Sequence, residues 1–278
     1  MTVQTHPQAT RDLRLAARQG LLPARGRGWL AGFGNMLGKE LGEWFHTRRW
    51  LWQLLIWLII INGLIAFMLW VAPMIAPEGA TPPKVTGLLY FFSTVSLTGT
   101  IGVIILAQDE IIQEKQSGTA AWILSKPVAR SAFILTKLLA NLFGALVFIV
   151  LLPGLVTLGE VFLAAHEVIP VGLFLAGAGV ILLALIFYLS LVILLGVLFE
   201  SRGPVLGIAL GVIFFCQLAG NYLPQIALVL PSSMHGIALG VAMGEPLPAM
   251  AVWGVISTAT MSIVFILVAL WRFQHTEL

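Results

Sequence analysis

The one long polar insertion between the apolar runs of this chain is residues 107–137, which holds seven of its 27 charged side chains. Only 10% of the chain is charged and 59% is hydrophobic, so such a stretch stands out. Five acids or bases fall within eighteen residues of it: Asp109, Glu110, Glu114, Lys115 and Lys126. These side chains form no catalytic pattern, but they present charge to water. The chemistry we expect is recognition of a soluble partner, which would deliver mechanical input to the surrounding helices.

Sequence motifs for catalysis, nucleotide binding or metal binding are absent or incomplete. The sequence contains no HExxH, GxSxG or CxxC motif, so the chain is not expected to be an enzyme by itself. Residues 32–40 (GFGNMLGKE) resemble a phosphate-binding loop, but Phe33 replaces the first glycine and Glu40 replaces the hydroxyl after Lys39. Two acids and a histidine could hold a metal, although an exposed polar loop is the favoured interpretation: Glu160, His166 and Glu167. No cofactor is predicted in this chain.

The composition indicates an all-α, multi-pass membrane protein. The mean hydropathy of the 278 residues is +0.99, and several apolar runs approach twenty residues. Each run can cross a hydrocarbon core of about 30 Å at about 1.5 Å per helical residue. The six predicted spans are residues 51–71, 87–106, 132–156, 171–198, 205–223 and 250–271. The fourth is the longest and is expected to tilt or protrude.

Three flanking segments complete the predicted organisation. Residues 1–28 carry five arginines and are expected to form a flexible basic tail near the lipid of the inner leaflet. Residues 29–49 predict an amphipathic helix in the membrane surface, and residues 273–278 a second tail. The apolar stripe of that helix is Leu30, Phe33, Leu37, Leu41 and Trp44. The excess of basic over acidic residues is attributed to loops that stay on the cytoplasmic side of the membrane, so no nucleic-acid partner is expected.

The lysines and arginines predict the orientation. With the amino terminus inside, fourteen of the fifteen fall on the inner side and only Lys84 falls outside. We therefore expect a multi-pass protein of the cell (inner) membrane with both termini and the polar insertion in the cytoplasm.

The insertion itself predicts two short helices. Residues 108–116 read as an extension of the second span, and Gly118 is expected to turn the chain. Thr119 is expected to cap a second helix over residues 120–124, which Pro127 stops. That helix carries a cluster of Trp122, Ile123 and Leu124, which either packs under the membrane surface or docks in a groove of a partner.

The segment between the fifth and sixth spans is too short and too rich in proline to cross twice. It predicts a re-entrant or interfacial hairpin, in which Ser232 or Ser233 caps a helix that reaches Gly244. Two glycine ridges with a four-residue repeat are candidates for close packing, either within one subunit or across a dimer. They are Gly203, Gly207 and Gly211, and Gly236, Gly240 and Gly244.

No acid or base is predicted near the middle of a span. Secondary transporters and proton relays usually need one, so energy for transport would have to come from outside the bilayer.

The run EKQSGTAAWILSKPVARSAFILTK resembles the signature region of type 2 ABC (ABC-2, type V exporter-like) transporter permeases. The residues that fit in order and spacing are Glu114, Gly118, Thr119, Leu124, Pro127, Arg130 and Lys137. The wider layout of residues 29–272 is similar too, with an amphipathic first helix, a six-span domain over residues 50–272 and a broken hairpin before the last span.

The resemblance implies that the insertion is a coupling helix seated on a separate cytoplasmic P-loop ATPase subunit, which binds ATP and Mg. It places seven residues in or beside that contact: Glu110, Glu114, Lys115, Ser117, Gly118, Thr119 and Trp122. It also implies a second permease subunit and export by alternating access. An apolar, uncharged lining would suit lipids, hydrophobic peptides or drugs, and the family resemblance leaves small ions open as a further substrate class. The alternatives are a secondary transporter and a membrane assembly protein that does not transport.

Overall fold

The computed structural model describes residues 28–76, 81–126, 128–223, 227 and 229–275. Within these ranges the chain is helical and contains no strand. Six helices are long and apolar enough to cross a membrane, as predicted. They are Trp50–Ile75, Pro83–Gln116, Arg130–Ala165, Val171–Leu198, Arg202–Gly220 and Ala249–Gln274. Residues 1–27 of the basic tail, Pro127 and residues 276–278 lie outside the described residues, and the last crossing helix continues to Gln274, into the predicted second tail.

The first three crossing helices are interrupted by wider π-helical turns. The first comprises α3 (Arg49–Trp57), η1 (Leu58–Asn62), α4 (Gly63–Ala66), η2 (Phe67–Val71) and α5 (Ala72–Ile75). The second comprises α6 (Pro83–Thr94), η3 (Val95–Gly99) and α7 (Thr100–Ala107) and continues into α8 (Glu110–Gln116). The third comprises α10 (Arg130–Gly144), η4 (Ala145–Leu151) and α11 (Leu152–Ala165). Because η3 also contacts η4, the irregular turns of two helices meet at one level of the bundle. Such turns commonly occur at functional sites.

The fourth crossing helix, α12 (Val171–Leu198), is the centre of the fold. It is apolar on every side and is the most buried of the six. Its neighbours include α7, α10, α13 (Arg202–Tyr222) and α16 (Ala249–Gln274). The sequence predicted the fourth span to be the longest, but in the structure the second and third crossing helices are longer, at 34 and 36 residues against 28 for α12.

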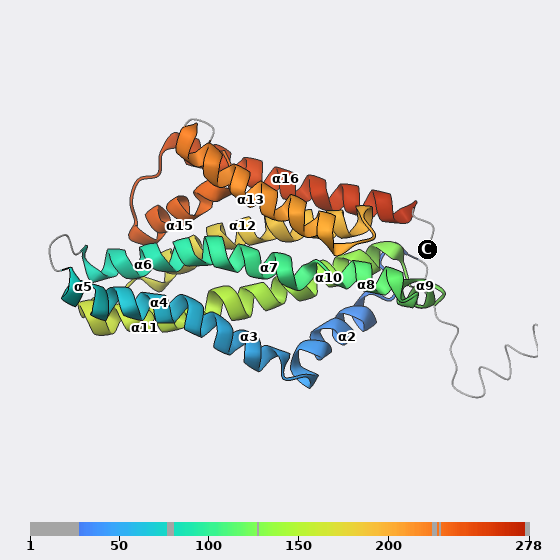
Figure 1. Cartoon of the computed structure of the whole chain (residues 1–278), viewed down its shortest axis with the longest axis horizontal. Coiled ribbons are helices and arrows are strands. Elements are labelled where there is room, and N and C mark those ends of the chain that lie inside the picture. Colours follow the sequence, from blue (N-terminus) through green and yellow to red (C-terminus); the bar gives the residue numbers. More distant parts are fainter. Residues whose placement is uncertain (1–27, 77–80, 127, 224–226, 228, 276–278) are drawn as a thin grey trace, which may run out of the picture.

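The polar elements gather at one end of the bundle. Figure 1 shows α8 (Glu110–Gln116) and α9 (Thr119–Leu124) at that end, together with α2 (Phe33–His46) and the end of α16. The opposite end holds α5 and the start of α6. Six crossings bring both ends of the described chain to the same side.

Helix α2 packs along α10, although not through the whole predicted stripe. Its buried line is Met36, Glu40 and Trp44, one turn apart, whereas Leu37 and Leu41 are half-buried and Leu30 is exposed. The Trp44 ring stacks on Phe148 at a centroid distance of 5.4 Å. It lies so close to Gly144 that a Cβ there would fall 2.4 Å from the ring, so this crossing requires glycine.

The segment before the last crossing helix forms η5 (Pro231–Ser233) and α15 (Met234–Met243). Helix α15 packs on α12 and α6, so its backbone is covered by protein. Gly244 ends it in the left-handed conformation, with φ of 72°. The predicted serine cap is wrong in detail. Ser233 occupies the capping position, but its side chain forms no capping hydrogen bond, and its hydroxyl instead donates to the Leu230 carbonyl at 2.8 Å.

The two glycine ridges differ in their surroundings. A Cβ on Gly203, Gly207 or Gly211 would meet no atom of the described chain within 4 Å, because these residues face away from α12. On the second ridge, Gly236 is also open, whereas a Cβ on Gly240 would lie 3.0 Å from Leu247. Packing within one subunit therefore does not account for the ridge on α13.

Candidate functional site

The polar insertion folds as a helical elbow, which consists of α8, the turn at Ser117 and Gly118, and α9. Gly118 makes the turn possible because its φ of 70° lies in the left-handed region. The predicted cap needs a correction: Thr119 is the first residue of α9, and its N–H donates to the Ser117 hydroxyl at 3.4 Å. The hydroxyl that accepts a hydrogen bond at the start of α9 is therefore that of Ser117 and not that of Thr119.

Helix α9 has one buried and one exposed face. Ala120 and Ile123 are buried in the core, and burying a side chain such as Ile123 contributes about 1.5–3 kcal/mol. Trp122 points the other way and is 62% exposed. The Lys126 Nζ lies 3.4 Å from the Trp122 ring centroid, a cation–π contact that fixes the indole at the surface. The elbow therefore presents an aromatic and cationic face while its opposite face anchors it.

A cavity of about 350 Å³ lies between α9 and α2. Its floor is apolar, and the ionisable side chains in its lining are both cationic: Lys39 and Lys126. The complete lining is Gly32, Asn35, Met36, Lys39, Thr119, Trp122, Ile123, Lys126 and Val128. This combination suits an apolar side chain of a protein partner with an acidic neighbour.

Behind the elbow lies a buried cluster of charges centred on Lys137. The Lys137 Nζ is 2.9 Å from Glu114 Oε1 on α8 and 3.1 Å from Glu40 Oε1 on α2. Lys137 and Glu40 are almost completely buried, and Glu114 is mostly buried. Beside them, Asn141 donates to Glu110 Oε2 at 2.7 Å. These contacts connect α2, α8 and α10 through side chains that water barely reaches.

Additional contacts connect the elbow region to the remaining helices. The Lys115 ammonium donates to the carbonyls of Gly196, Val197 and Phe199, at 3.1–3.4 Å, at the carboxyl end of α12. A cation is favourable there because the helix dipole is negative at that end. Arg202 of α13 approaches Asp109 at 2.6 Å between Nε and Oδ1. The chain that leaves the elbow is fixed as well, since Arg130 donates to the Phe273 and Gln274 carbonyls of α16.

The sequence of residues 55–278 matches the model of a family described as a protein of unknown function (DUF2705). The chain belongs to this family. No curated protein matches it. The matched part of this DUF2705 member begins inside the first crossing helix and includes the other five, together with the elbow and Lys137. Helix α2 and Glu40 precede it.

The structure divides the partner contact residues expected for this DUF2705 member into two groups. Ser117, Gly118, Thr119 and Trp122 lie on the outer side of the elbow. Glu110, Glu114 and Lys115 turn inward and make the contacts described above, so a docking contact would be made by the first group. Three further residues of the family-like motif are described: Leu124 is half-buried, Lys137 is buried, and Arg130 contacts α16.

Sequence reasoning missed Glu40, Asn141 and Arg202 as members of this site. A signal for Glu40 existed, because a lysine inside an apolar helix requires a buried acid as a partner. Sequence spacing does not say which acid supplies it, since Glu40 and Lys137 are 97 residues apart.

The acids and histidine considered for a metal do not converge. Glu160 turns into the bundle, where it accepts a hydrogen bond from Asn62 Nδ2 at 3.1 Å. Glu167 lies 3.9 Å from Lys84 instead. Across the described part of the DUF2705 chain, no three His, Cys, Asp or Glu side chains could hold a metal ion together.

Proposed function

We propose that this chain is the membrane-spanning permease subunit of an ATP-binding cassette exporter, with the elbow as the docking site for a separate cytoplasmic ATPase subunit. One observation carries the proposal. The elbow exposes Trp122 at its tip while its base is connected to the membrane helices through buried or charge-assisted contacts. Tryptophan is among the residue types in which interface hot spots are enriched.

The contacts at the base account for how a push on α9 would reach the membrane. Lys137 joins α8 to the third crossing helix and Lys115 joins it to the fourth. Asp109 and Arg130 extend the connections to the fifth and sixth. Because packed helices and paired charges resist bending, the elbow would move these helices as a unit rather than deform by itself.

In this proposal the polar end faces the cytoplasm, with both termini on that side of the cell (inner) membrane, and α2 lies along the membrane surface. Two permease subunits enclose the transport path, and the open glycine ridge of α13 supports a face where a second subunit packs closely. Nucleotide binding and closure by the ATPase pair would shift the equilibrium between inward-open and outward-open arrangements. ATP and Mg belong to the partner. The segment with α15 would form the outer re-entrant hairpin.

Copurification tests the docking site. Trp122→Ala in the tagged chain is expected to reduce the copurified ATPase subunit at least tenfold in mild detergent, because hot-spot truncation costs about 2 kcal/mol or more. Trp253→Ala is the matched control: Trp253 is 60% exposed, close to the 62% of Trp122, but lies on α16. Both variants should be recovered from the membrane in wild-type amounts. Undiminished ATPase recovery with Trp122→Ala would contradict the docking site, and transport that persists without any ATPase would contradict the proposed function.

A further inference from the structure

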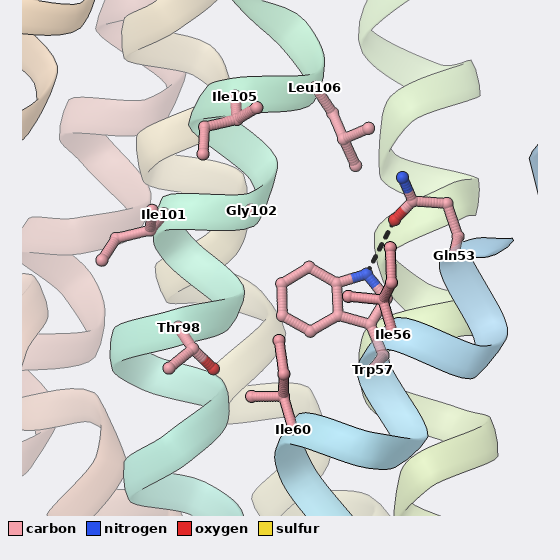
Figure 2. A pocket seen from close by; sticks show the side chains of 9 residues that line it. All are labelled: Gln53, Ile56, Trp57, Ile60, Thr98, Ile101, Gly102, Ile105 and Leu106. Atoms are coloured by element: carbon pink, nitrogen blue, oxygen red, sulfur yellow. Dashed lines mark hydrogen bonds between the residues drawn. The ribbon is translucent and has the colours of Figure 1, made fainter.

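A groove runs between the first and second crossing helices (Figure 2). Its volume is about 400 Å³, within the range of about 300–1,000 Å³ typical of small-molecule sites. One wall is formed by residues at helical spacing on α3 and η1, and the other wall by residues at helical spacing on η3 and α7. The lining residues are Gln53, Ile56, Trp57, Ile60, Thr98, Ile101, Gly102, Ile105 and Leu106.

The groove exists because glycine lies opposite a tryptophan. A Cβ on Gly102 would fall 2.2 Å from the Trp57 ring, so only glycine allows the indole to reach the facing backbone. Trp57 is buried there, and Figure 2 shows its ring between the two helices. The rims remain open: Ile56, Ile60 and Ile105 are exposed. The two helices thus touch through one ring and leave a furrow along their outer side.

Three polar groups of the lining are paired within the chain: Trp57 Nε1 donates to Gln53 Oε1 at 2.9 Å, and the Thr98 hydroxyl donates to the Thr94 carbonyl at 2.8 Å. The lining therefore offers an occupant apolar contact and almost no hydrogen bonding. Acids and bases are also absent from the lining, so electrostatics would not select an ionic ligand.

The dimensions favour one hydrocarbon chain over a helix. From Thr98 to Leu106 the lining extends eight residues, about 12 Å along the helix. Dividing the volume of about 400 Å³ by this length gives a cross-section of about 33 Å². A helix about 10 Å in diameter has a cross-section of about 80 Å². A helix of another subunit could cover the groove, but its body could not enter it.

We infer that this groove binds one acyl chain of a bilayer phospholipid. Its polar end begins at Gln53, three residues after the first crossing helix starts at Trp50, so this end would lie near the headgroup region of a bilayer that the helix crosses. A phospholipid can therefore seat a chain in the groove while its headgroup stays at the interface. The inference stands independently of the proposed function, since it uses only the groove and its position in the crossing helices.

Photolabelling of the full chain in nanodiscs tests this binding. The probe is a phosphatidylcholine that carries a diazirine in the middle of one acyl chain, and labelled peptides are mapped by mass spectrometry. We expect labels concentrated on residues 53–60 and 98–106 and displaced by excess unlabelled phosphatidylcholine. Ile105→Trp should fill the groove and reduce this labelling at least fivefold. Ile263→Trp is the matched control, because Ile263 is also 56% exposed but lies on α16.

Thr98→Leu is a second, smaller filling variant, to be used if Ile105→Trp does not migrate as wild type in size-exclusion chromatography. It should reduce labelling at least twofold. Labels spread evenly over all six crossing helices, or unaffected by either filling variant, would overturn the inference. So would a groove free of label whose Ile60→Cys variant crosslinks to a second copy, because protein rather than lipid would then cover it.

Discussion

Replacing Lys137 by methionine should destabilise the fold far more than removing a lysine from the surface. Methionine keeps most of the buried stem but removes the ammonium that lies 2.9 Å from Glu114 and 3.1 Å from Glu40. Both carboxylates would then be buried without a counter-charge. Breaking a buried pair in this way costs about 3–5 kcal/mol, mainly because an uncompensated charge stays buried.

An exposed lysine–glutamate pair in the same chain serves as the control for the buried Lys137 pairs. Lys39 lies 3.5 Å from Glu43 one turn away, and both side chains are about half exposed. Such a pair is worth about 0.3–0.5 kcal/mol. At about 2–4 °C per kcal/mol, Lys137→Met should lower the melting temperature by about 6–20 °C and Lys39→Met by about 1–2 °C.

Melting of the purified full chain in detergent, followed by the loss of its monodisperse size-exclusion peak, measures the difference. A triple variant that combines Lys137→Met with Glu40→Gln and Glu114→Gln removes the stranded charges, so it should recover at least half of the lost melting temperature. If Lys137→Met melts within about 2 °C of wild type, or if the triple variant is worse than the single one, the buried pairs do not hold these helices together.

Two further substitutions test the Lys115 contacts and the open glycine ridge of α13. Lys115→Met removes three charge-assisted hydrogen bonds to the end of α12. It should lower the free energy of unfolding by about 1.5–3 kcal/mol in the same melting assay. An unchanged melting temperature would mean that the ammonium is equally well solvated without α12. Gly207→Leu introduces a side chain where the described chain leaves open space, so the monomer should fold normally. If a second subunit packs there, multi-angle light scattering will show at least a tenfold weaker dimer, whereas a dimer of unchanged strength would exclude this face.

The crossing helices could be predicted closely because their cause is local. A run of about twenty apolar residues has to satisfy its backbone internally in lipid, and the helix does so residue by residue. Five of the six predicted spans lie within the observed helices, and the fifth ends one residue beyond α13 at residue 223. The turn at Gly118 and the break at Gly244 followed in the same way, since each needs a left-handed backbone that glycine adopts readily.

The amphipathic stripe of α2 shows where local reasoning weakens. Hydrophobicity alone selected Leu37 and Leu41, yet Glu40 is the buried neighbour of Trp44 on this helix. An acid reads as solvent-facing in a sequence unless its partner is known. That partner, Lys137, follows 97 residues later on another helix.

The sequence by itself therefore determined the membrane class, the number of crossing helices and the position of the elbow, because each depends on neighbours in the chain. Only the tertiary structure decided which elbow residues face outward. It turned Glu114 and Lys115 toward α10 and α12 and left Trp122 at the surface. The physical reason is that a charge near a membrane is placed by its counter-charge or by a helix end, and these come from distant segments that meet only in the folded bundle.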